Sequence, residues 1–460
     1  MSSIQPTHVD TLKAGFAGEI FLPGTEGYEK SRAIWNGMID KKPGAIARCA
    51  NTKDVVAAVN LAREHGLTLA VKGGGHNIAG SALCNDGLVI DLSGMKRVTV
   101  DTAARRATVQ GGALLGDFDA ATLPHGLATP LGINSTTGVA GLTLGGGFGW
   151  LSRKYGMSVD NLESAEVVTA DGQVRHVSAS ENADLFWAIR GGSGNFGVVT
   201  QFEFRLHPVG PDVLTGLIVY PIAQAAGVLR KYRDFVANAP DELSVWSVLR
   251  LAPPLPFLPE AAHNKGMIAL AFCYAGDPAV GEPLVQPLRS FGTPVGEHIG
   301  VQPYTAWQQA FDPLLAPGAR NYWKSHNFST IPDGLIDAVV SAIDTLPSPQ
   351  CEIFFGAIGG ATMRAAVDAT AYPNRDALYV MNVHGRWDTA AEDERGVKWA
   401  RDFFKASAPF ATGSVYVNFL TDEETDRVAA AYGPNYGRLA SIKKTYDPTN
   451  LFCTNMNIKP

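Results

Sequence analysis

The sequence predicts an α+β protein of two domains. The chain has 460 residues, which is more than one hydrophobic core usually organises. In the first 200 residues short strands and helices mix irregularly among clusters of glycine. Beyond residues 208–211 the strands become longer and more apolar, with helical stretches between them. The two parts therefore differ in local structure, as two domains would.

The first part contains one clear amphipathic helix and several short strands. Residues 51–66 predict the helix, because Val55, Val59 and Ala62 share one face and Gly66 can end it. An Asp171–Gly172 turn predicts a hairpin, and residues 184–189 predict a second helix. Strands are expected at residues 67–71, 88–92, 98–100, 107–109, 165–169 and 198–204. This order is typical of an α+β domain rather than of a regular βαβ repeat.

The second part predicts an antiparallel sheet backed by helices. The stretch at residues 222–236 has Ala225, Leu229, Tyr232 and Val236 on one helical face. Strands are expected at residues 214–220, 243–251, 267–274, 351–358 and 378–387. From Tyr416 onward glycine and asparagine become frequent again, which indicates a return to the first domain. The predicted division is residues 1–210, residues 211–415 and a C-terminal segment, residues 416–460.

Composition excludes several classes of protein. The net charge of −6 argues against nucleic acid as a partner, because binding phosphates requires a surplus of Lys and Arg on one face. Five scattered cysteines, with no metal-ligand spacing, predict neither a disulfide framework nor a metal site. No apolar run is long enough to span a membrane, and residues 1–20 lack a signal-peptide pattern. We expect a cytoplasmic protein without membrane partners. The sequence leaves open whether it forms a homodimer.

Three glycine clusters lie in the first 200 residues, and one of them ends in a histidine. Residues 71–80 are VKGGGHNIAG, residues 132–149 are GINSTTGVAGLTLGGGFG, and residues 191–197 are GGSGNFG. With seven glycines, residues 132–149 are expected to be too flexible for a core element and too apolar for a disordered linker. Glycine lets backbone N–H groups approach a flat or phosphorylated ligand closely. Residues 73–80 lack the glycine order of a dinucleotide-binding fold and no helix clearly follows them, and no P-loop motif occurs in the chain. His76 would then be either a reactive group at this ligand or a histidine that hydrogen-bonds the turn.

Four motifs carry a resemblance to a known family. They are KGGGHNIAG, TTGVAGLTLGGGFGWLSRKYGMSVDNL, GGSGNFGVVT and NYGRLASIKKTYDPTNLF. In this order and spacing the chain resembles the berberine-bridge-enzyme-like FAD-linked oxidases of the vanillyl-alcohol-oxidase superfamily, and their bacterial type similar to 6-hydroxy-D-nicotine oxidase. The resemblance implies a two-domain PCMH/VAO-type flavoprotein. FAD would lie in the first domain, and the antiparallel sheet of the second domain would cover the substrate.

The resemblance also implies which residues hold the cofactor. His76 would carry an 8α-histidyl bond to FAD, as a neutral imidazole is nucleophilic. The other expected contacts are Lys72, Gly73, Gly74, Gly75, Asn77, Ile78, Gly132, Thr136, Thr137, Gly138, Gly141, Leu144, Gly147, Phe148, Gly149, Val198, Asn418 and Asn457. Many relatives add a second bond through a cysteine at the position of Asn134, and no cysteine lies nearby here. We therefore expect attachment through His76 only, and a large sugar becomes a less favoured substrate.

The catalytic base is not at its usual place in the resembling family. Relatives often carry a tyrosine where this chain has Phe419, and a phenyl ring cannot accept a proton. His384 and Asn382 share one face of the predicted strand at residues 378–387, and a neutral imidazole can act as a base. Tyr322 and Lys324 are further candidates. The alternative is a substrate that needs no base, such as an amine that loses hydride directly.

Together these features predict an FAD-dependent oxidase. It would transfer hydride from an alcohol or amine C–H bond to covalently bound FAD, and O2 would reoxidise the flavin to give H2O2. A small-molecule substrate and O2 are the expected partners. Two alternatives stay open: a dehydrogenase of the same fold that uses another electron acceptor, and a flavin-binding protein that has lost turnover.

Overall fold

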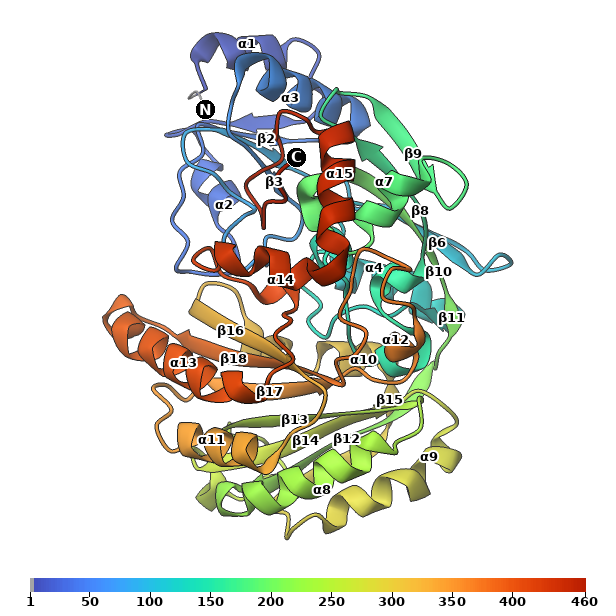
Figure 1. The fold of residues 1–460 in the computed structure, drawn as a ribbon, viewed down its shortest axis with the longest axis vertical. Helices are drawn as coiled ribbons and strands as arrows, with labels where there is room; N and C mark the ends of the chain where they lie inside the picture. Colours follow the sequence, from blue (N-terminus) through green and yellow to red (C-terminus); the bar gives the residue numbers. More distant parts are fainter. Residues whose placement is uncertain (1–3) are drawn as a thin grey trace.

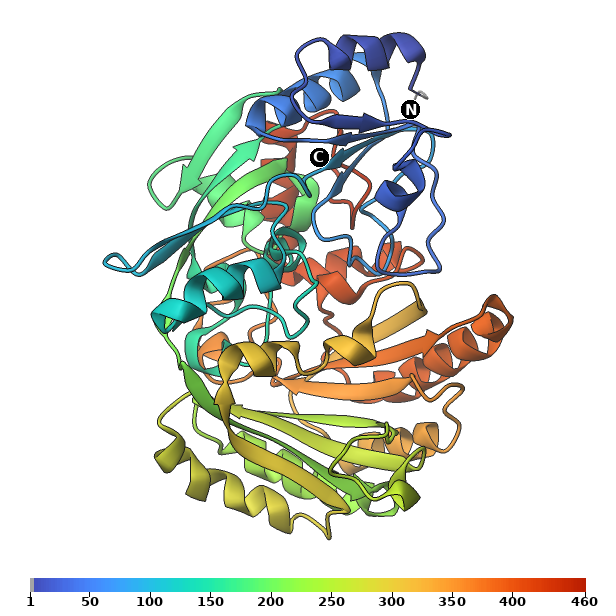
Figure 2. The ribbon, with the colours of Figure 1, turned by 180° about the vertical axis from the view of Figure 1, so that it is seen from behind.

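The computed structural model describes residues 4–460, which form two lobes. In Figure 1 the upper lobe contains the first part of the chain, coloured blue to green, and the red C-terminal part. The lower lobe contains the yellow and orange middle part, and Figure 2 shows the same division from behind. The predicted α+β fold with two domains is confirmed. The first three residues of the predicted first domain lie outside the described residues.

A four-stranded sheet lies at the N-terminal end of the upper lobe. Its order is β1-β2-β4-β3, and β2 and β3 both run parallel to β4. The strands are β1 (Glu19–Phe21), β2 (Ala45–Arg48), β3 (Leu69–Lys72) and β4 (Leu88–Asp91). Helix α3 (Thr52–His65) connects β2 to β3 and confirms the predicted helix. Asn51 caps its N-terminus by accepting a hydrogen bond from the Asp54 N–H, and Gly66 ends it in the left-handed conformation.

A five-stranded antiparallel sheet forms the rest of the upper lobe. Its order is β5-β6-β10-β8-β9. The strands are β5 (Val98–Asp101), β6 (Arg106–Gln110), β8 (Leu162–Val168), β9 (Val174–Ser178) and β10 (Val198–Arg205). The pair β7 (Leu127–Ala128) and β11 (His207–Pro208) lies beside it. The helices of this lobe that precede residue 210 are α1 (Pro6–Lys13), α2 (Tyr28–Arg32), α3, α4 (Leu115–Thr122), α5 (Val139–Leu144), α6 (Ser152–Tyr155) and α7 (Ala183–Ile189).

One sequence expectation about the second glycine cluster is wrong. Residues 132–149 were expected to be too flexible for a core element, but they contain the short helix α5. Its residues Val139, Ala140, Thr143 and Leu144 are buried. Glycines stand on both sides of this apolar segment, so that the chain can turn sharply at each end of a short helix.

The lower lobe is built on a seven-stranded antiparallel sheet. Its order is β15-β12-β14-β13-β17-β18-β16. The strands are β12 (Asp212–Pro221), β13 (Leu243–Leu251), β14 (Gly266–Tyr274), β15 (Gly296–Pro303), β16 (Arg320–Phe328), β17 (Glu352–Ala357) and β18 (Tyr379–Trp387). Helices α8 (Ala225–Ala237), α11 (Asp333–Ile343) and α13 (Asp393–Ser407) cover one face (Figure 1). Three shorter helices are α9 (Pro278–Val285), α10 (Tyr304–Gln309) and α12 (Ala361–Arg364).

Sequence patterns did not predict β15 and β16, the two edge strands of this sheet. β15 is half exposed, and it has polar residues and glycines where the central strands have apolar ones. β16 has the sequence RNYWKSHNF, although most of it is buried. Its polar side chains form ion pairs and hydrogen bonds that no local pattern indicates.

The C-terminal segment packs on the upper lobe. Helix α14 (Val428–Tyr432) precedes helix α15 (Tyr436–Tyr446), which lies beside α7 in Figure 1, and Pro448 follows the end of α15. The fully buried Lys443 ammonium donates to the Asn195 carbonyl at 2.7 Å and to the Asp447 carboxylate at 2.6 Å. Thr454 donates to the Leu69 carbonyl at 3.0 Å. We propose the division at residues 210 and 415 that the sequence predicts, and these contacts support it.

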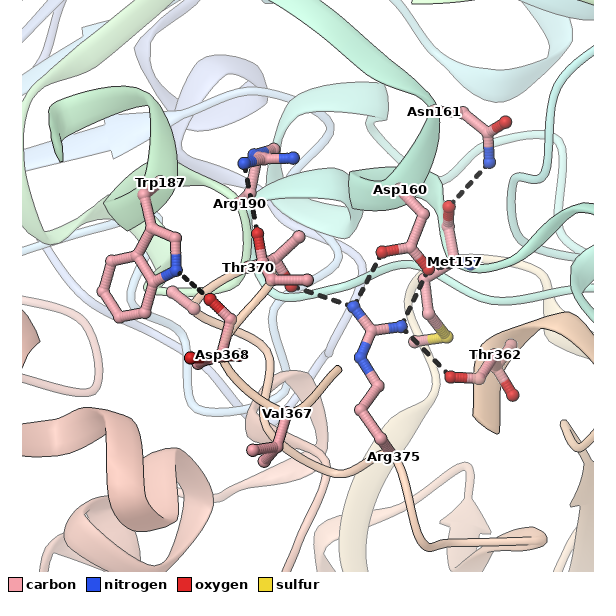
Figure 3. A network of polar contacts seen from close by, with 12 residues as sticks. Met157, Asp160, Asn161, Trp187, Arg190, Thr362, Val367, Asp368, Thr370 and Arg375 are labelled. Atoms are coloured by element: carbon pink, nitrogen blue, oxygen red, sulfur yellow. Dashed lines mark hydrogen bonds and ion pairs between the residues drawn. The ribbon is translucent and has the colours of Figure 1, made fainter. Parts of the chain in front are cut away.

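A buried ion pair joins the lobes on one side (Figure 3). Arg375, in the segment between α12 and β18, binds both carboxylate oxygens of Asp160 at 2.8 and 2.7 Å. The same guanidinium donates to the Thr370 hydroxyl at 2.9 Å and to the Thr362 carbonyl at 3.3 Å. Nearby, the Trp187 indole donates to the Asp368 carbonyl at 2.7 Å (Figure 3). The bidentate contact between Arg375 and Asp160 fixes both the position and the orientation of the two side chains.

Asp119 of α4 lies buried where this helix meets α10 of the lower lobe. The Gln308 amide donates to Asp119 Oδ2 at 3.2 Å and to the Gly132 carbonyl at 3.1 Å. Burial raises the pKa of Asp119 from 3.8 to about 7, against the opposing effect of Gln308. Between these values the folded chain holds a proton that the unfolded chain has lost. The contribution of Asp119 to stability therefore decreases as pH rises from about 4 to about 7.

We expect Asp119→Asn to remove this loss, because the amide keeps an acceptor for Gln308 and stays neutral. The free energy of unfolding of wild type should fall by about 2–3 kcal/mol from pH 5 to pH 8 through this effect, and that of the variant should not. The difference in stability between variant and wild type should therefore change by about 2–3 kcal/mol in favour of the variant over this range. Urea unfolding at both pH values measures the gain, with the exposed Asp10→Asn as control. An equal pH dependence in the variant and wild type would contradict the prediction.

Among residues 4–460, no helix is both long enough and apolar enough to cross a bilayer.

Candidate active site

One cavity of about 530 Å³ lies between the lobes. The loops that carry the three glycine clusters form its upper wall, and the uncovered face of the seven-stranded sheet forms its floor. The C-terminal segment closes one end with Phe452, Thr454, Asn455 and Met456. The cavity therefore collects residues from all three segments of the predicted division.

Most residues expected to bind the cofactor line this cavity. They are Gly73, Gly74, Gly75, His76, Asn77, Gly132, Thr137, Gly138, Gly141, Leu144, Phe148, Val198 and Asn418. The third glycine cluster also contributes Ser193, Gly194, Gly197 and Val199, which were not assigned individually from the sequence although the cluster itself was noted. Asn134, Trp35 and Asn455 were likewise not predicted as cofactor contacts.

Six of the expected contacts do not line this cavity. Lys72 points away from it and binds the Ser31 carbonyl at 2.7 Å, because neighbouring Val71 takes the cavity side of the strand. The carbonyl of Ile78 accepts from Asn36. Thr136 reaches the site only through His76. Side chains at Gly147 and Gly149 would collide with Ser158 and with the Leu131 carbonyl, so these glycines serve protein packing. Asn457 does not line the cavity, although its neighbour Met456 does.

The upper wall fits a large flat cofactor such as FAD. Gly74 and Gly138 pack backbone to backbone, because a Cβ at Gly74 would lie 2.3 Å from the Gly138 nitrogen. A Cβ at Gly141 would meet no protein atom within 4 Å, so this backbone faces open space. Asn455 donates to the Gly194 carbonyl at 2.9 Å, but its buried Oδ1 has no partner among the described residues. An acceptor left free at a cavity wall fits a ligand that donates a hydrogen bond.

His76 lies in this wall as an uncharged imidazole. Its ring stacks on Trp35 with centroids 5.1 Å apart. Its Nε2 contacts the Thr136 hydroxyl at 2.8 Å, and its Nδ1 lies 3.5 Å from the Thr137 hydroxyl. Burial lowers the pKa of His76 to about 4, so the ring is neutral near pH 7. A neutral imidazole keeps one nitrogen lone pair for chemistry.

The sheet floor carries a polar row across three neighbouring strands. Strand register places Arg250 of β13 opposite Glu352 of β17, and Glu352 opposite His384 of β18. Arg250 binds Glu352 Oε2 at 2.8 Å, and His384 Nδ1 lies 3.5 Å from Glu352 Oε1. Burial favours the protonated carboxyl of Glu352, but Arg250 and His384 outweigh it, and its pKa falls to about 2. Glu352 is therefore an ionised carboxylate inside the cavity.

Glu352 and Arg250 were not among the predicted site residues, although both interrupt predicted apolar strands. A charged residue in a strand that is otherwise buried was the signal that could have indicated them. Their pairing partners could not be read from the sequence, because strand register depends on residues far apart in the chain.

The tautomer of His384 follows from its neighbour Asn321. The Asn321 amide donates to the Ala319 carbonyl at 2.7 Å, and its Oδ1 accepts from Arg386 at 3.0 Å. Because Asn321 Oδ1 is thereby identified as the acceptor, His384 Nε2, at 3.0 Å from it, must carry the hydrogen. Burial lowers the pKa of His384, against the opposing effect of Glu352. The neutral ring therefore keeps its lone pair on Nδ1, beside Glu352.

Asn382 lies on the same strand face as His384, as the sequence predicted. Its side chain is buried and lines the cavity, and its Oδ1 has no hydrogen-bond partner in the described part of the chain. Leaving a buried polar group unsatisfied costs about 1–3 kcal/mol. A bound molecule with an N–H or O–H group would satisfy this oxygen.

Tyr322 and Lys324 do not reach the cavity, which corrects their prediction as catalytic candidates. On β16 they lie on the face opposite Trp323, which does line it. The Tyr322 hydroxyl donates to Glu423 and accepts from Arg401. Lys324 pairs with Glu423 at 2.5 Å and Glu424 at 3.2 Å. Both side chains thus belong to an ion cluster behind the sheet.

Aromatic side chains surround the remaining space. Phe419, at the position where the resembling family often has tyrosine, lines the cavity and contacts Trp323 with centroids 5.2 Å apart. Trp246 stacks on Trp150 at 4.5 Å and on Phe354 at 5.9 Å. No group of three or more His, Cys, Asp or Glu residues that could hold a metal ion occurs within residues 4–460.

Comparison with known proteins gives the cofactor and the family. Residues 43–178 match the family described as FAD binding domain, and residues 415–459 match the family described as berberine and berberine like. With the fold and the glycine-lined cavity, these matches define an FAD-linked oxidoreductase. The chain belongs to the berberine-bridge-enzyme-like family of these enzymes, as its motifs indicated.

Individual relatives span nearly the whole chain. An FAD-linked oxidoreductase of Dictyostelium discoideum is 33% identical over 96% of this chain and 95% of its own. The (R)-6-hydroxynicotine oxidase of Paenarthrobacter nicotinovorans is 30% identical over 96% of this chain and 97% of its own. The structure of 6-hydroxy-D-nicotine oxidase from Arthrobacter nicotinovorans superposes with a TM-score of 0.87 at 29% identity, covering 97% of this chain and 98% of that one.

Proposed function

We propose that this protein is an oxidase with FAD covalently attached through His76. It would oxidise a small alcohol or amine by removing hydride from a C–H bond, with O2 as electron acceptor and H2O2 as product. One observation carries the proposal: a neutral, partly buried His76 and the polar row at His384 line the same cavity, and both histidine rings contact Trp35. Bound FAD supplies the hydride acceptor and the reaction with O2.

Attachment at a single site is supported by the residues around His76. No cysteine lines the cavity among residues 4–460, and the position of the second attachment in the resembling family is Asn134. The glucooligosaccharide oxidase of Acremonium strictum is described with 6-S-cysteinyl, 8α-N1-histidyl FAD. Its structure superposes with a TM-score of 0.86 at 25% identity, covering 98% of this chain and 99% of that one. Of these two bonds, this chain has the residue for the histidyl one.

We assign the base for a hydroxyl substrate to His384. Its Nδ1 would accept the proton, and the ionised Glu352 at 3.5 Å would stabilise the imidazolium that forms. Asn321 holds the ring in the orientation that presents Nδ1. An amine substrate would need no such transfer if it loses hydride as the free base, and Phe419 is compatible with that alternative.

The lining of the cavity favours an apolar, ring-containing substrate. Trp246, Phe354 and Trp323 offer flat surfaces for it, and they also exclude water from the reacting carbon. Asn382 Oδ1 is the free acceptor that would orient a substrate N–H or O–H group. One relative is named as an (R)-6-hydroxynicotine oxidase, and hydroxynicotine is a small ring-containing molecule, which agrees with this class.

A panel of aromatic alcohols and amines tests the proposed function. With a true substrate, O2 uptake and H2O2 formation should be equal, and substrate added without O2 should bleach the flavin absorbance. Bleaching that only an artificial dye reverses would indicate a dehydrogenase instead. A flavin that no member of the panel bleaches would favour a protein without turnover.

A further inference from the structure

Asn134 and Thr136 form a chain of hydrogen bonds that ends on His76. Resting on the proposed attachment of FAD at His76, we propose that they are positioning residues for that attachment: they hold the hydrogen of His76 on Nε2, so that Nδ1 forms the bond to the flavin. Asn134 thus has a role of its own at the position where the resembling family often has a second attachment.

Counting hydrogens along the chain fixes its direction. Asn134 Oδ1 accepts from the Thr136 N–H at 2.9 Å and lies 2.6 Å from the Thr136 hydroxyl oxygen. A carbonyl oxygen has no hydrogen to give, so the single hydroxyl hydrogen of Thr136 points to Asn134. The same hydroxyl oxygen lies 2.8 Å from His76 Nε2 and can only accept there. Nε2 therefore carries the ring hydrogen.

The remaining nitrogen, Nδ1, keeps its lone pair in the neutral ring. It contacts the Thr137 hydroxyl at 3.5 Å, which is too far for a strong hydrogen bond. Stacking on Trp35 fixes the plane of the ring. The geometry thus leaves one nucleophilic atom in a defined direction.

The attachment balances as an oxidation. A methyl C–H bond of the flavin breaks, a C–N bond to Nδ1 forms, and the Nε2 hydrogen leaves the ring. Two protons and two electrons are released, and O2 accepts the two electrons and the two protons to become H2O2. Afterwards Nε2 has no hydrogen, so the Thr136 hydroxyl can rotate away from Asn134 and donate to Nε2. Thr136 can thus hydrogen-bond the ring before and after the reaction.

The loop that carries both residues is also held from the lower lobe. The Ser135 N–H donates to Asp312 Oδ1 at 2.9 Å, and its hydroxyl donates to the other carboxylate oxygen. Substitutions of the neighbouring side chains should therefore leave the loop in place. This separates their effect on His76 from an effect on folding.

The first experiment measures covalent FAD by intact mass in the full-length chain, produced without riboflavin and then mixed with FAD. Thr136→Val should slow attachment at least about tenfold, the loss usual for groups that orient a reacting imidazole. Asn134→Ala should slow it less, and Thr136→Ser should restore it. The control is Thr143→Val, which removes a buried hydroxyl without a partner in the described chain. Attachment by Thr136→Val at the wild-type rate would overturn the proposal.

A second measurement does not depend on the variants folding. Nitrogen-15 NMR of labelled wild-type chain before FAD is added should show His76 with the hydrogen on Nε2, with His76→Ala identifying the signal. After attachment, the histidyl flavin released by hydrolysis should be substituted at Nδ1. A hydrogen on Nδ1, or substitution at Nε2, would refute the role of Asn134 and Thr136. If the Nε2 hydrogen is seen but FAD never attaches, the proposed covalent attachment is refuted. The tautomer of His76 is then confirmed, but it has no role in attachment.

Discussion

His76→Ala should abolish covalent attachment of FAD completely. Alanine has no nucleophilic atom, and no cysteine lines the cavity among residues 4–460 to replace the imidazole. After acid precipitation the wild-type pellet should stay yellow, whereas the flavin of the variant should remain in the supernatant. Flavin fluorescence of the chain on a denaturing gel gives the same comparison without precipitation.

His326→Ala is the matched control for this variant. His326 is buried, and as for His76 burial lowers its pKa to about 4, but it stacks on Phe404 away from the cavity. Its replacement should leave the flavin attached, even if it costs some stability. A yellow precipitate from His76→Ala, or the loss of covalent flavin from both variants, would remove His76 as the attachment site.

Arg375→Met should lower the free energy of unfolding by about 3–5 kcal/mol, the usual cost of leaving one partner of a buried ion pair unpaired. The guanidinium is 5% exposed and the Asp160 side chain 16%, so water can solvate little of the remaining carboxylate. The pair also joins the two lobes that enclose the cavity (Figure 3). Urea unfolding of wild type and variant measures the loss.

Two further variants test the cause of that loss. Adding Asp160→Asn to Arg375→Met removes the unpaired charge and should recover part of the stability. Lys398→Met breaks an exposed pair with Asp402, 72% and 64% exposed, and should cost no more than about 1 kcal/mol. If Arg375→Met lowered the free energy of unfolding as little as Lys398→Met does, the pair of Arg375 and Asp160 would not be what stabilises the contact between the lobes.

Local patterns were sufficient for the central elements of the fold. Helix α3 has a cap, an apolar face and a glycine stop within its own sequence, and strands such as β14 are continuous apolar runs. The edge strands β15 and β16 lack such runs. Helix α5 was missed for a related reason, since its glycines suggested flexibility although its apolar residues are buried.

The sequence alone determined the upper wall of the site. The glycine clusters and His76 are contiguous motifs, and their residues act through backbone that lies close together in the chain. It also placed Asn382 and His384 on one strand face, because alternation along a strand is a local property.

Only the tertiary structure decided what surrounds His384. It brought Glu352 and Arg250 beside this histidine from two other strands, and it turned Tyr322 and Lys324 to the far side of the sheet. The physical reason is strand register. Pairing between distant segments decides which side chains become neighbours, and a shift of one residue would exchange the two faces.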